Sequence, residues 1–155
     1  TLEVKGIQAP TGYKLAMPAG HILQVVQSST STLVSTTSSS YVTTGLSASI
    51  TPSSTSSKIL ILASGAADTK AGERQHFLAF FRDSTNLNSA GSSNAFGTLY
   101  SPSRVITNIS GEYLDSPSST SSITYSLRMN NPASGQIDFT SQGTVSYITL
   151  MEVAG

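Results

Sequence analysis

Apolar and polar residues alternate along most of the chain, and clusters rich in Ser, Thr, Asn, Gly and Pro separate the alternating runs. In "SITYSLRM", the apolar side chains Ile123, Tyr125, Leu127 and Met129 occupy every second position. A period of two is typical of a β-strand that buries one face and exposes the other. This segment is therefore predicted to be an outer strand with one solvated face.

The same criterion predicts a series of strands bounded by turn residues, and no segment has a sustained helical period with caps. The longer predicted strands are His21–Gln27, Tyr41–Ile50, Lys58–Ser64, Gln75–Arg82, Arg104–Leu114, Ser122–Met129 and Gly143–Val153, and the shorter ones are Leu33–Thr37, Ala95–Tyr100 and Gln136–Thr140. Many short strands without helices indicate an all-β fold, either a sandwich or a barrel.

Three of these strands, "KILILAS", "HFLAFF" and "VSYITLMEV", are apolar on both faces. A strand of a two-layer sandwich needs only one apolar face, so the second face is expected to meet another copy of the chain. The alternative is a closed barrel, or a sheet covered by the chain's own loops. The predicted residues of a trimer interface are Ile59, Ile61, Phe77, Phe81, Ile148 and Leu150.

Composition narrows the class of protein. The chain has 155 residues, which is the size of one domain, and it contains no Cys, which excludes disulfides and thiolate metal sites. Charged residues are 10% of the chain and the formal net charge is +0, so nucleic acid and anionic lipid are not expected partners. No apolar run approaches the ~20 residues of a membrane span. Residues 1–20 are expected to be an extended lead-in to a β-sandwich domain over residues 21–155.

Candidate catalytic residues are few. His21 and His76 each border a predicted strand and are far apart in sequence, so a structural role is favoured for both. Glu112 and Asp115 are close enough in sequence to suggest a paired-carboxylate glycosidase site, or a Ca²⁺ site, but acids are also common in wet turns at strand ends. No nucleophile elbow, P-loop or dinucleotide fingerprint is present. We therefore predict a protein that is not an enzyme and that has no cofactor or metal.

Loops rich in Asn, Asp, Arg and Gly are the expected binding surface, because a rigid sheet holds loops whose sequence is free to vary. The longest is Asp83–Gly97, "DSTNLNSAGSSNAFG", and a loop of this length is either functional or a simple insertion. Asp68–Arg74 is expected to be a solvated loop tip. The predicted receptor-binding residues are Asn86, Asn88, Asn94, Phe96, Tyr100, Asp68 and Arg74.

A Ser/Thr-rich word occurs twice, as "TPSSTSS" and "PSSTSS", and each time it precedes a predicted strand. Pro52 and Pro117 are expected to stop the preceding strand by removing a ladder donor, while the hydroxyls satisfy the turn backbone. Ser and Thr together form roughly a third of the chain, and they alternate with apolar residues or stand between apolar runs. This distribution favours a folded β-protein whose solvent faces carry hydroxyls instead of charges.

The words "PAGHILQVVQ", "GLSASITPSSTSSKILILAS", "YLDSPSSTSSITYSLRM" and "YITLMEVAG" resemble a C-terminal domain that recurs in bacteriophage tail-fibre and other virion-surface proteins. The resemblance covers about residues 18–155. It implies a homotrimeric knob with an antiparallel jelly-roll-like sandwich, similar in layout to trimers of the C1q and tumour-necrosis-factor (TNF) type. It also implies a place at the distal end of a virion fibre, an upstream shaft and attachment to a host-surface glycan or protein.

The sequence is also compatible with three other functions. A head fibre or capsid-decorating knob is still a virion protein, and the sequence does not separate it from a tail-fibre tip. A glycan-cleaving tailspike-type enzyme belongs to another class, and release of sugar from host polysaccharide would identify it. A secreted cellular adhesin module is the third, and a signal peptide in the full-length gene would favour it.

Overall fold

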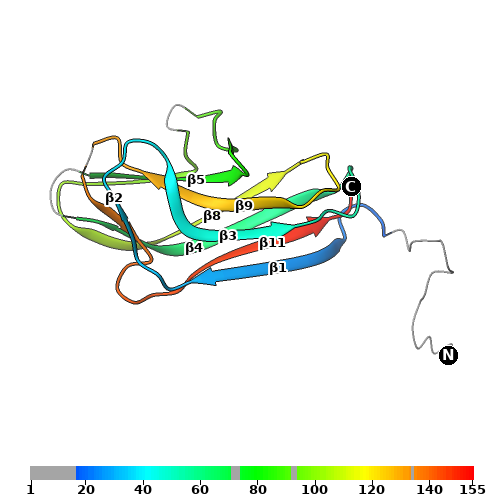
Figure 1. The fold of residues 1–155 in the computed structure, drawn as a ribbon, viewed down its shortest axis with the longest axis horizontal. Coiled ribbons are helices and arrows are strands. Elements are labelled where there is room, and N and C mark those ends of the chain that lie inside the picture. Colours follow the sequence, from blue (N-terminus) through cyan, green and yellow to red (C-terminus); the bar gives the residue numbers. More distant parts are fainter. Residues whose placement is uncertain (1–16, 71–73, 92–93, 134) are drawn as a thin grey trace.

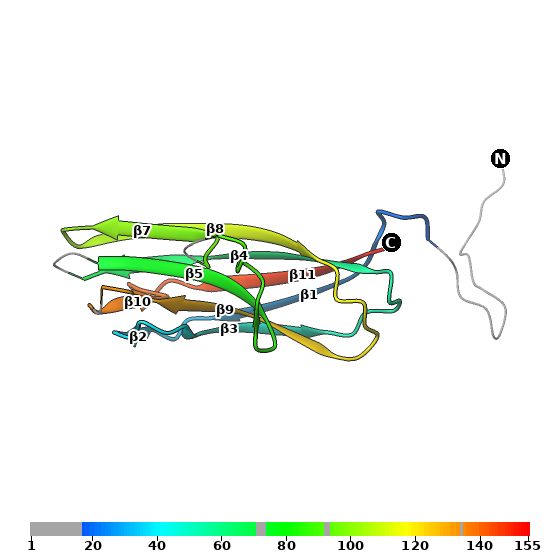
Figure 2. The same cartoon turned by 90° about the horizontal axis from the view of Figure 1, so that it is seen from above.

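Two antiparallel β-sheets stack to form a sandwich whose strands run along the long axis of the molecule (Figures 1 and 2). The computed structural model describes residues 17–70, 74–91, 94–133 and 135–155. Of the predicted lead-in, residues 1–16 lie outside this description. Gly20 donates its backbone N–H to the Ala154 carbonyl at 2.8 Å, so the start of the described chain lies beside its end.

The first sheet has the order β1-β11-β4-β10-β2, with β8 on the other edge of β4. Its strands are β1 (Ile22–Thr30), β2 (Val34–Thr36), β4 (Lys58–Thr69), β8 (Val105–Asp115), β10 (Ile137–Phe139) and β11 (Ser146–Val153). The second sheet has the order β3-β9-β5-β6, with β7 also paired to β5. Its strands are β3 (Val42–Ile50), β5 (Arg74–Arg82), β6 (Thr85–Asn86), β7 (Gly97–Ser101) and β9 (Ile123–Asn130).

The strand pairs are nested in sequence. β1 pairs with β11, β3 with β9, β4 with β8, and β5 with β7, always antiparallel. Each pair therefore encloses the next, as in one long hairpin that is folded over on itself. The cross-pairs β11–β4 and β9–β5 then join the hairpin's turns into two sheets.

The core lies between the sheets and is built from the alternate side chains that face inward. On β4 and β11 these include Ile59, Ile61, Ile148 and Leu150, all at 0% exposure. They meet inward side chains of the second sheet, among which are Leu46, Leu78, Phe80, Tyr125, Leu127 and Met129. Burial of this apolar surface is the main stabilising term of the fold, at about 25 cal/mol per Å².

The all-β prediction is confirmed, and each of the ten predicted strands overlaps an observed one. No helix occurs in the described part of the chain. The sequence did not predict β6, which is only two residues long. It also ended the Lys58–Ser64 strand too early, because β4 continues to Thr69.

One of the three two-faced apolar strands has its second face covered by the protomer itself. Phe81 on β5 faces away from the core but is only 7% exposed. The Tyr41 ring packs edge-on against it at 5.4 Å, and the Arg128 guanidinium lies 4.3 Å from its ring centroid. Burial raises the pKa of Tyr41 to about 12. At Phe81, therefore, the second apolar face is covered by side chains of the same chain.

Candidate functional site

The outer face of the first sheet carries exposed apolar side chains. Successive side chains of a strand point to opposite faces, so the neighbours of the core residues on β4 and β11 point outward. Val25, Met151, Leu60 and Leu114 are partners in register across β1, β11, β4 and β8. They form one row across the sheet, which we call the apolar row. Its two ends, Val25 and Leu114, are 56% and 51% exposed.

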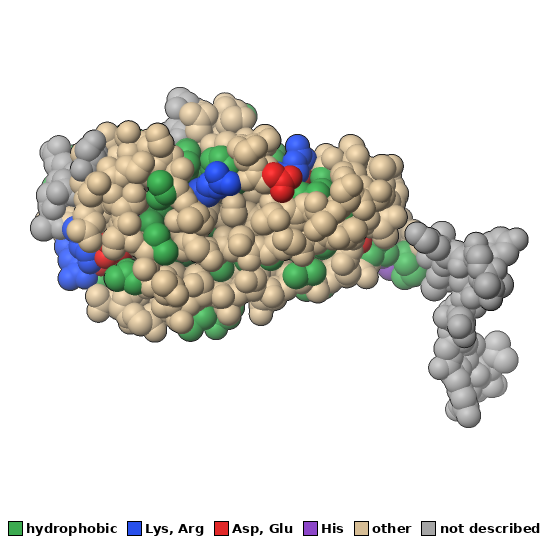
Figure 3. Space-filling view, in the orientation of Figure 1, with side chains coloured by type: hydrophobic (Ala, Val, Ile, Leu, Met, Phe, Trp, Pro, Cys, Tyr) green, Lys and Arg blue, Asp and Glu red, His purple; other side chains and the backbone are tan. Residues whose placement is uncertain are grey.

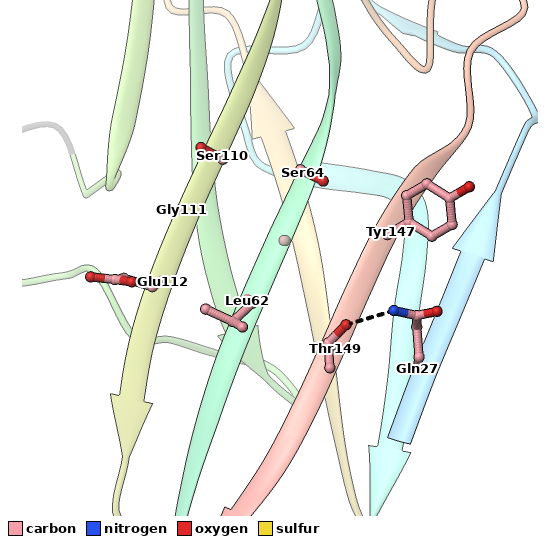
Figure 4. Close-up of a pocket in the computed structure, with 9 residues that line it drawn as sticks. Gln27, Leu62, Ser64, Ser110, Gly111, Glu112, Tyr147 and Thr149 are labelled. Carbon is pink, nitrogen blue, oxygen red and sulfur yellow. Dashed lines mark hydrogen bonds between the residues drawn. The ribbon is translucent and has the colours of Figure 1, made fainter. Parts of the chain in front are cut away.

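A groove of about 640 Å³ lies next to the apolar row on the same face (Figure 4). Leu62 on β4 lies in the middle of the groove. Gln27 and Tyr147 stand on one side, on β1 and β11. Glu112 on β8 lies at the opposite rim, where its side chain points away from Leu62 and Thr149. Ser64 and Ser110, which are cross-strand partners on β4 and β8, line one end of the groove. The groove is therefore built by four strands of one sheet and needs no loop to hold it.

Most polar groups of the groove are unpaired within the described chain. The Gln27 side-chain amide donates to the Thr149 hydroxyl at 3.0 Å (Figure 4). The side chains of Tyr147, Ser64, Ser110 and Glu112 make no hydrogen bond or ion pair with any described residue. Tyr147 is 44% exposed. The groove thus offers an aromatic ring and hydroxyls to whatever lies above it, and it has one carboxylate at its rim.

The structure places the predicted interface residues inside the protomer. Ile59, Ile61, Ile148 and Leu150 are core side chains, Phe81 is covered by Tyr41 and Arg128, and only Phe77 is half-buried on the outer face of β5. A fully buried side chain cannot contact a second copy. On β4 and β11 these four residues are therefore excluded from any contact between copies, and the side chains that remain outward are their sequence neighbours, among them Leu60 and Met151.

The predicted receptor-binding loop is held against the edge of β5. Asn88 accepts the Phe80 N–H with its side-chain oxygen at 2.7 Å, and Leu87 donates its N–H to the Phe80 carbonyl at 2.9 Å. The side chain of Asn86 donates to the Asn94 carbonyl and accepts the Asn88 N–H, each at 2.8 Å. The Asn88 side chain thus satisfies an N–H at the edge of β5, and the Asn86 side chain satisfies backbone groups of the loop itself.

Phe96 completes the attachment of this loop. Its ring stacks on Phe80 at 4.6 Å with an interplanar angle of 16°. It lies directly over Gly111 on β8, where a Cβ atom would collide with the ring. A ring packed in this way is not a free stacking face for a sugar. In the predicted set, Asn94 and Tyr100 have exposed side chains, with Tyr100 at 56%.

The expectation of a solvated loop tip at Asp68 is wrong. Asp68 lies in β4 at 0% exposure, where Arg104 donates to it with Nε at 3.1 Å and Nη2 at 2.8 Å. Arg74 begins β5, and its side chain lies outside the described part. The ion pairs allow a charged residue to extend a buried strand, and the sequence pattern alone does not reveal them.

Asp68 belongs to a cluster of four charges at the end of the sheet opposite the apolar row. Lys70 lies between two carboxylates, 3.0 Å from Asp68 Oδ2 and 2.6 Å from Asp138 Oδ2. Burial raises the pKa of Asp68, but hydrogen bonds from Arg104, Lys70 and Ser141 outweigh it and hold the pKa at about 2. Asp138 is directly opposite Asp68 on β10, so the ammonium offsets a like-charge pair.

The "TPSSTSS" word binds a buried carboxylate at the other end. Glu152, at 1% exposure, accepts hydrogen bonds at 2.7 Å from the Ser53 N–H, the Ser53 hydroxyl and the Ser57 hydroxyl. The Gln24 amide donates to its second oxygen at 2.6 Å. Burial raises the pKa of Glu152, but these four donors lower it to about 2. The hydroxyls thus serve a distant side chain as well as the turn.

The candidate catalytic groups do not converge. Asp115 faces inward, where Arg82 Nη1 donates to its Oδ1 at 3.0 Å and its Oδ2 at 2.9 Å, and the Tyr125 hydroxyl donates to Oδ2 at 2.7 Å. Glu112 faces outward on the opposite side of the same strand. His21 is exposed beside the Pro18 carbonyl, whereas His76 is fully buried and neither of its ring nitrogens has a described partner.

Within the described ranges, no group of three or more His, Asp or Glu side chains is arranged to hold a metal ion. None of the described segments is a helix long and apolar enough to cross a membrane. Comparison with known proteins found no family model that matches the chain and no curated protein with significant similarity to it.

Proposed function

We propose that this domain is a non-enzymatic attachment knob, which assembles as a homotrimer at the distal end of a bacteriophage tail fibre and binds a receptor on the host surface. The observation that carries the proposal is the apolar row. Four registered apolar side chains across an otherwise hydroxyl-rich sheet form the kind of contiguous exposed patch that marks an interaction surface. On the face of the molecule that Figure 3 shows, which has β3 and β9 in front, charged side chains are few as well.

The nested strand pairing supports a jelly-roll layout for this knob. In a jelly roll, two Greek keys arise when one long hairpin is rolled into two sheets. The pairs β1–β11, β3–β9, β4–β8 and β5–β7 follow that order, and β10 and β2 extend the first sheet. The layout resembles the C1q and TNF type, which is trimeric, and a closed three-fold arrangement ends a fibre without open contacts.

The position of the chain ends supports attachment to a shaft. β1 begins opposite the end of β11, because Ile22 is in register with Val153. The apolar row lies near this end, two residues before the end of β11 at Met151. A knob joined to its shaft here directs its opposite end, where β2, β10 and the β7–β8 turn lie, toward the host (Figure 2).

The geometry of the carboxylates favours binding over catalysis. A glycosidase pair needs two carboxyl groups that face each other across a substrate, about 5–9.5 Å apart. Asp115 is inside the sandwich, engaged by Arg82 and Tyr125, while Glu112 is on the outer face. Because the two carboxyl groups lie on opposite faces of β8, they cannot act together on one substrate.

Two measurements on the purified domain test this function. Fluorescently labelled protein is expected to bind cells of a susceptible strain in a panel of bacteria and to compete with phage adsorption to that strain. No reducing sugar should be released from the polysaccharides of these strains. Sugar release that is lost in Glu112→Gln would identify the glycan-cleaving enzyme instead. Labelled protein that binds no strain in the panel would contradict the attachment role.

A further inference from the structure

We infer that the groove beside the apolar row is a binding site for a neutral saccharide. This deepens the proposed function by naming the chemistry of the receptor and the place where it binds. The groove has the volume of a small-ligand site, and its walls come from four hydrogen-bonded strands, so it is formed before any ligand arrives.

The polar groups of the groove match a polyhydroxylated ligand. Tyr147 presents an exposed ring with a polar tip, which gives apolar contact and a hydrogen bond together. Ser64 and Ser110 carry hydroxyls that donate and accept, and both are unpaired within the described chain. The Gln27 amide keeps its carbonyl oxygen available while its NH₂ group donates to Thr149. Sugar hydroxyls, which also donate and accept, complement all of these groups.

The charge of the groove selects among saccharides. Glu112 is the one charged residue in the lining, and no Lys or Arg accompanies it. A carboxylate accepts two hydrogen bonds from neighbouring hydroxyls of a neutral sugar. It repels uronic and sialic acids, whose carboxylates would find no cation in the groove. The ligand class is therefore a chain of neutral sugars.

The groove and the apolar row are neighbouring but separate parts of one face. Leu62 lies in the groove, whereas Leu60, two residues earlier on β4, belongs to the apolar row. Subunit contact through the row leaves the groove beside the contact. Three copies in one trimer would then combine weak single sites by avidity.

Saturation-transfer difference NMR with short neutral oligosaccharides of glucose, galactose, mannose and N-acetylglucosamine tests the inference. Oligogalacturonate and oligosialic acid are the charged counterparts. At least one neutral oligosaccharide is expected to bind with a millimolar or lower Kd, and the charged ones are expected not to bind. Tyr147→Ala should weaken that binding by about tenfold or more. Glu112→Gln should weaken neutral binding and reduce the discrimination against the charged oligosaccharides.

Ser47→Ala, an exposed position on β3 in the second sheet, is the control and should bind like the parent. Sedimentation of each variant separates this inference from the assembly. A monomeric parent whose oligosaccharide binding depends on Tyr147 would contradict the proposed trimer but support the saccharide site in the groove. If the parent trimer binds none of the neutral oligosaccharides, the groove is not a saccharide site. The same conclusion follows if the Tyr147→Ala variant binds them as well as the parent does. A Tyr147→Ala or Glu112→Gln protein that becomes monomeric would overturn the saccharide site too, since the groove would then be a subunit contact.

Discussion

The Ser53 hydroxyl and the Glu152 carboxylate are 99 residues apart in sequence and lie 2.7 Å apart in space. The bond ties the loop between β3 and β4 to the last strand. Its physical basis is that a buried carboxylate needs donors, and the Ser/Thr word supplies them without a cation. The second Ser/Thr word stands beside a carboxylate as well, but Asp115 there is engaged by Arg82 and Tyr125.

Ser57→Ala is therefore expected to destabilise the domain by about 1–3 kcal/mol at neutral pH, because it removes one donor from a buried charged acceptor. Chemical denaturation monitored by tyrosine fluorescence or circular dichroism measures this loss. Ser122→Ala, an exposed position in the second word, should change stability by less than about 0.5 kcal/mol. Equal effects of the two substitutions would show that the hydroxyls of the first word serve only the turn.

The contact between Phe96 and Gly111 gives a non-additive prediction. Phe96→Ala should cost about 2–4 kcal/mol through loss of stacking on Phe80, and Gly111→Ala should cost a similar amount because its methyl group would displace the ring. In the double variant, the added methyl group meets no ring. The double variant should then be hardly less stable than Phe96→Ala alone. Strictly additive losses in denaturation would contradict the packing of Phe96 over Gly111.

Lys70→Met leaves the buried Asp68 and Asp138 opposite each other without the ammonium between them. We expect a loss of about 2 kcal/mol at pH 7, smaller than for a fully buried pair because Lys70 is partly exposed and Arg104 still pairs with Asp68. Hydrogen bonds from Lys70 help to depress the pKa of both acids, so the loss should shrink as the pH falls below 3.8. Lys58→Met is the matched control, since Lys58 is exposed at the start of β4.

Burial of His76 should make the free energy of unfolding depend on pH. Burial lowers its pKa from 6.5 to about 4, although the charges of Asp138 and Asp68 act in the opposite direction. The unfolded chain therefore binds a proton between pH 6.5 and 4 that the folded chain excludes. Stability from this residue is complete above pH 6.5 and falls as the pH drops toward 4, by about 3 kcal/mol in all.

His76→Leu should remove most of that slope. Thermal or urea unfolding between pH 7.5 and 4.5 measures it, in a range where Asp68 and Glu152 remain ionised in the folded state. The parent protein should lose stability steadily over this range, and the variant should lose little. A variant as acid-sensitive as the parent would show that another group controls the response.

The strand positions followed from the period-two pattern, but the direction of some side chains did not. In "ITYSLRM" the polar residues identify the outer face, and the structure buries Ile123, Tyr125 and Leu127 as expected. In "KILILAS" both faces are apolar, so nothing in the pattern tells Ile59 from Leu60. The choice is made by the partner strands, because Ile59 lies between Asp115 and Glu152, which both turn inward to their hydrogen-bond donors.

The proposed binding surface was harder to predict than the fold for a related reason. The asparagines of Asp83–Gly97 look like adaptable ligand-binding groups, but the Asn88 side chain satisfies the edge of β5 and the Asn86 side chain satisfies backbone groups of the loop itself. Conversely, Gln27, Tyr147 and Thr149 belong to two strands that are far apart in sequence and form a groove only when β1 pairs with β11. The two-faced apolar pattern of β4 and β11 was the one signal that pointed to this face.

Sedimentation velocity at micromolar concentration, on the parent and on Leu60→Asp, tests the central claim most directly. Leu150→Asp would not serve, because Leu150 is in the protomer's own core. Leu60→Asp places a charge in the apolar row, where burial in a subunit contact costs several kcal/mol, and Ser47→Asp on the second sheet is the matched control. We predict a parent and a control at three times the 16.1 kDa chain mass, and a folded monomer for Leu60→Asp. A monomeric parent, or a Leu60→Asp protein that remains a trimer, would contradict it.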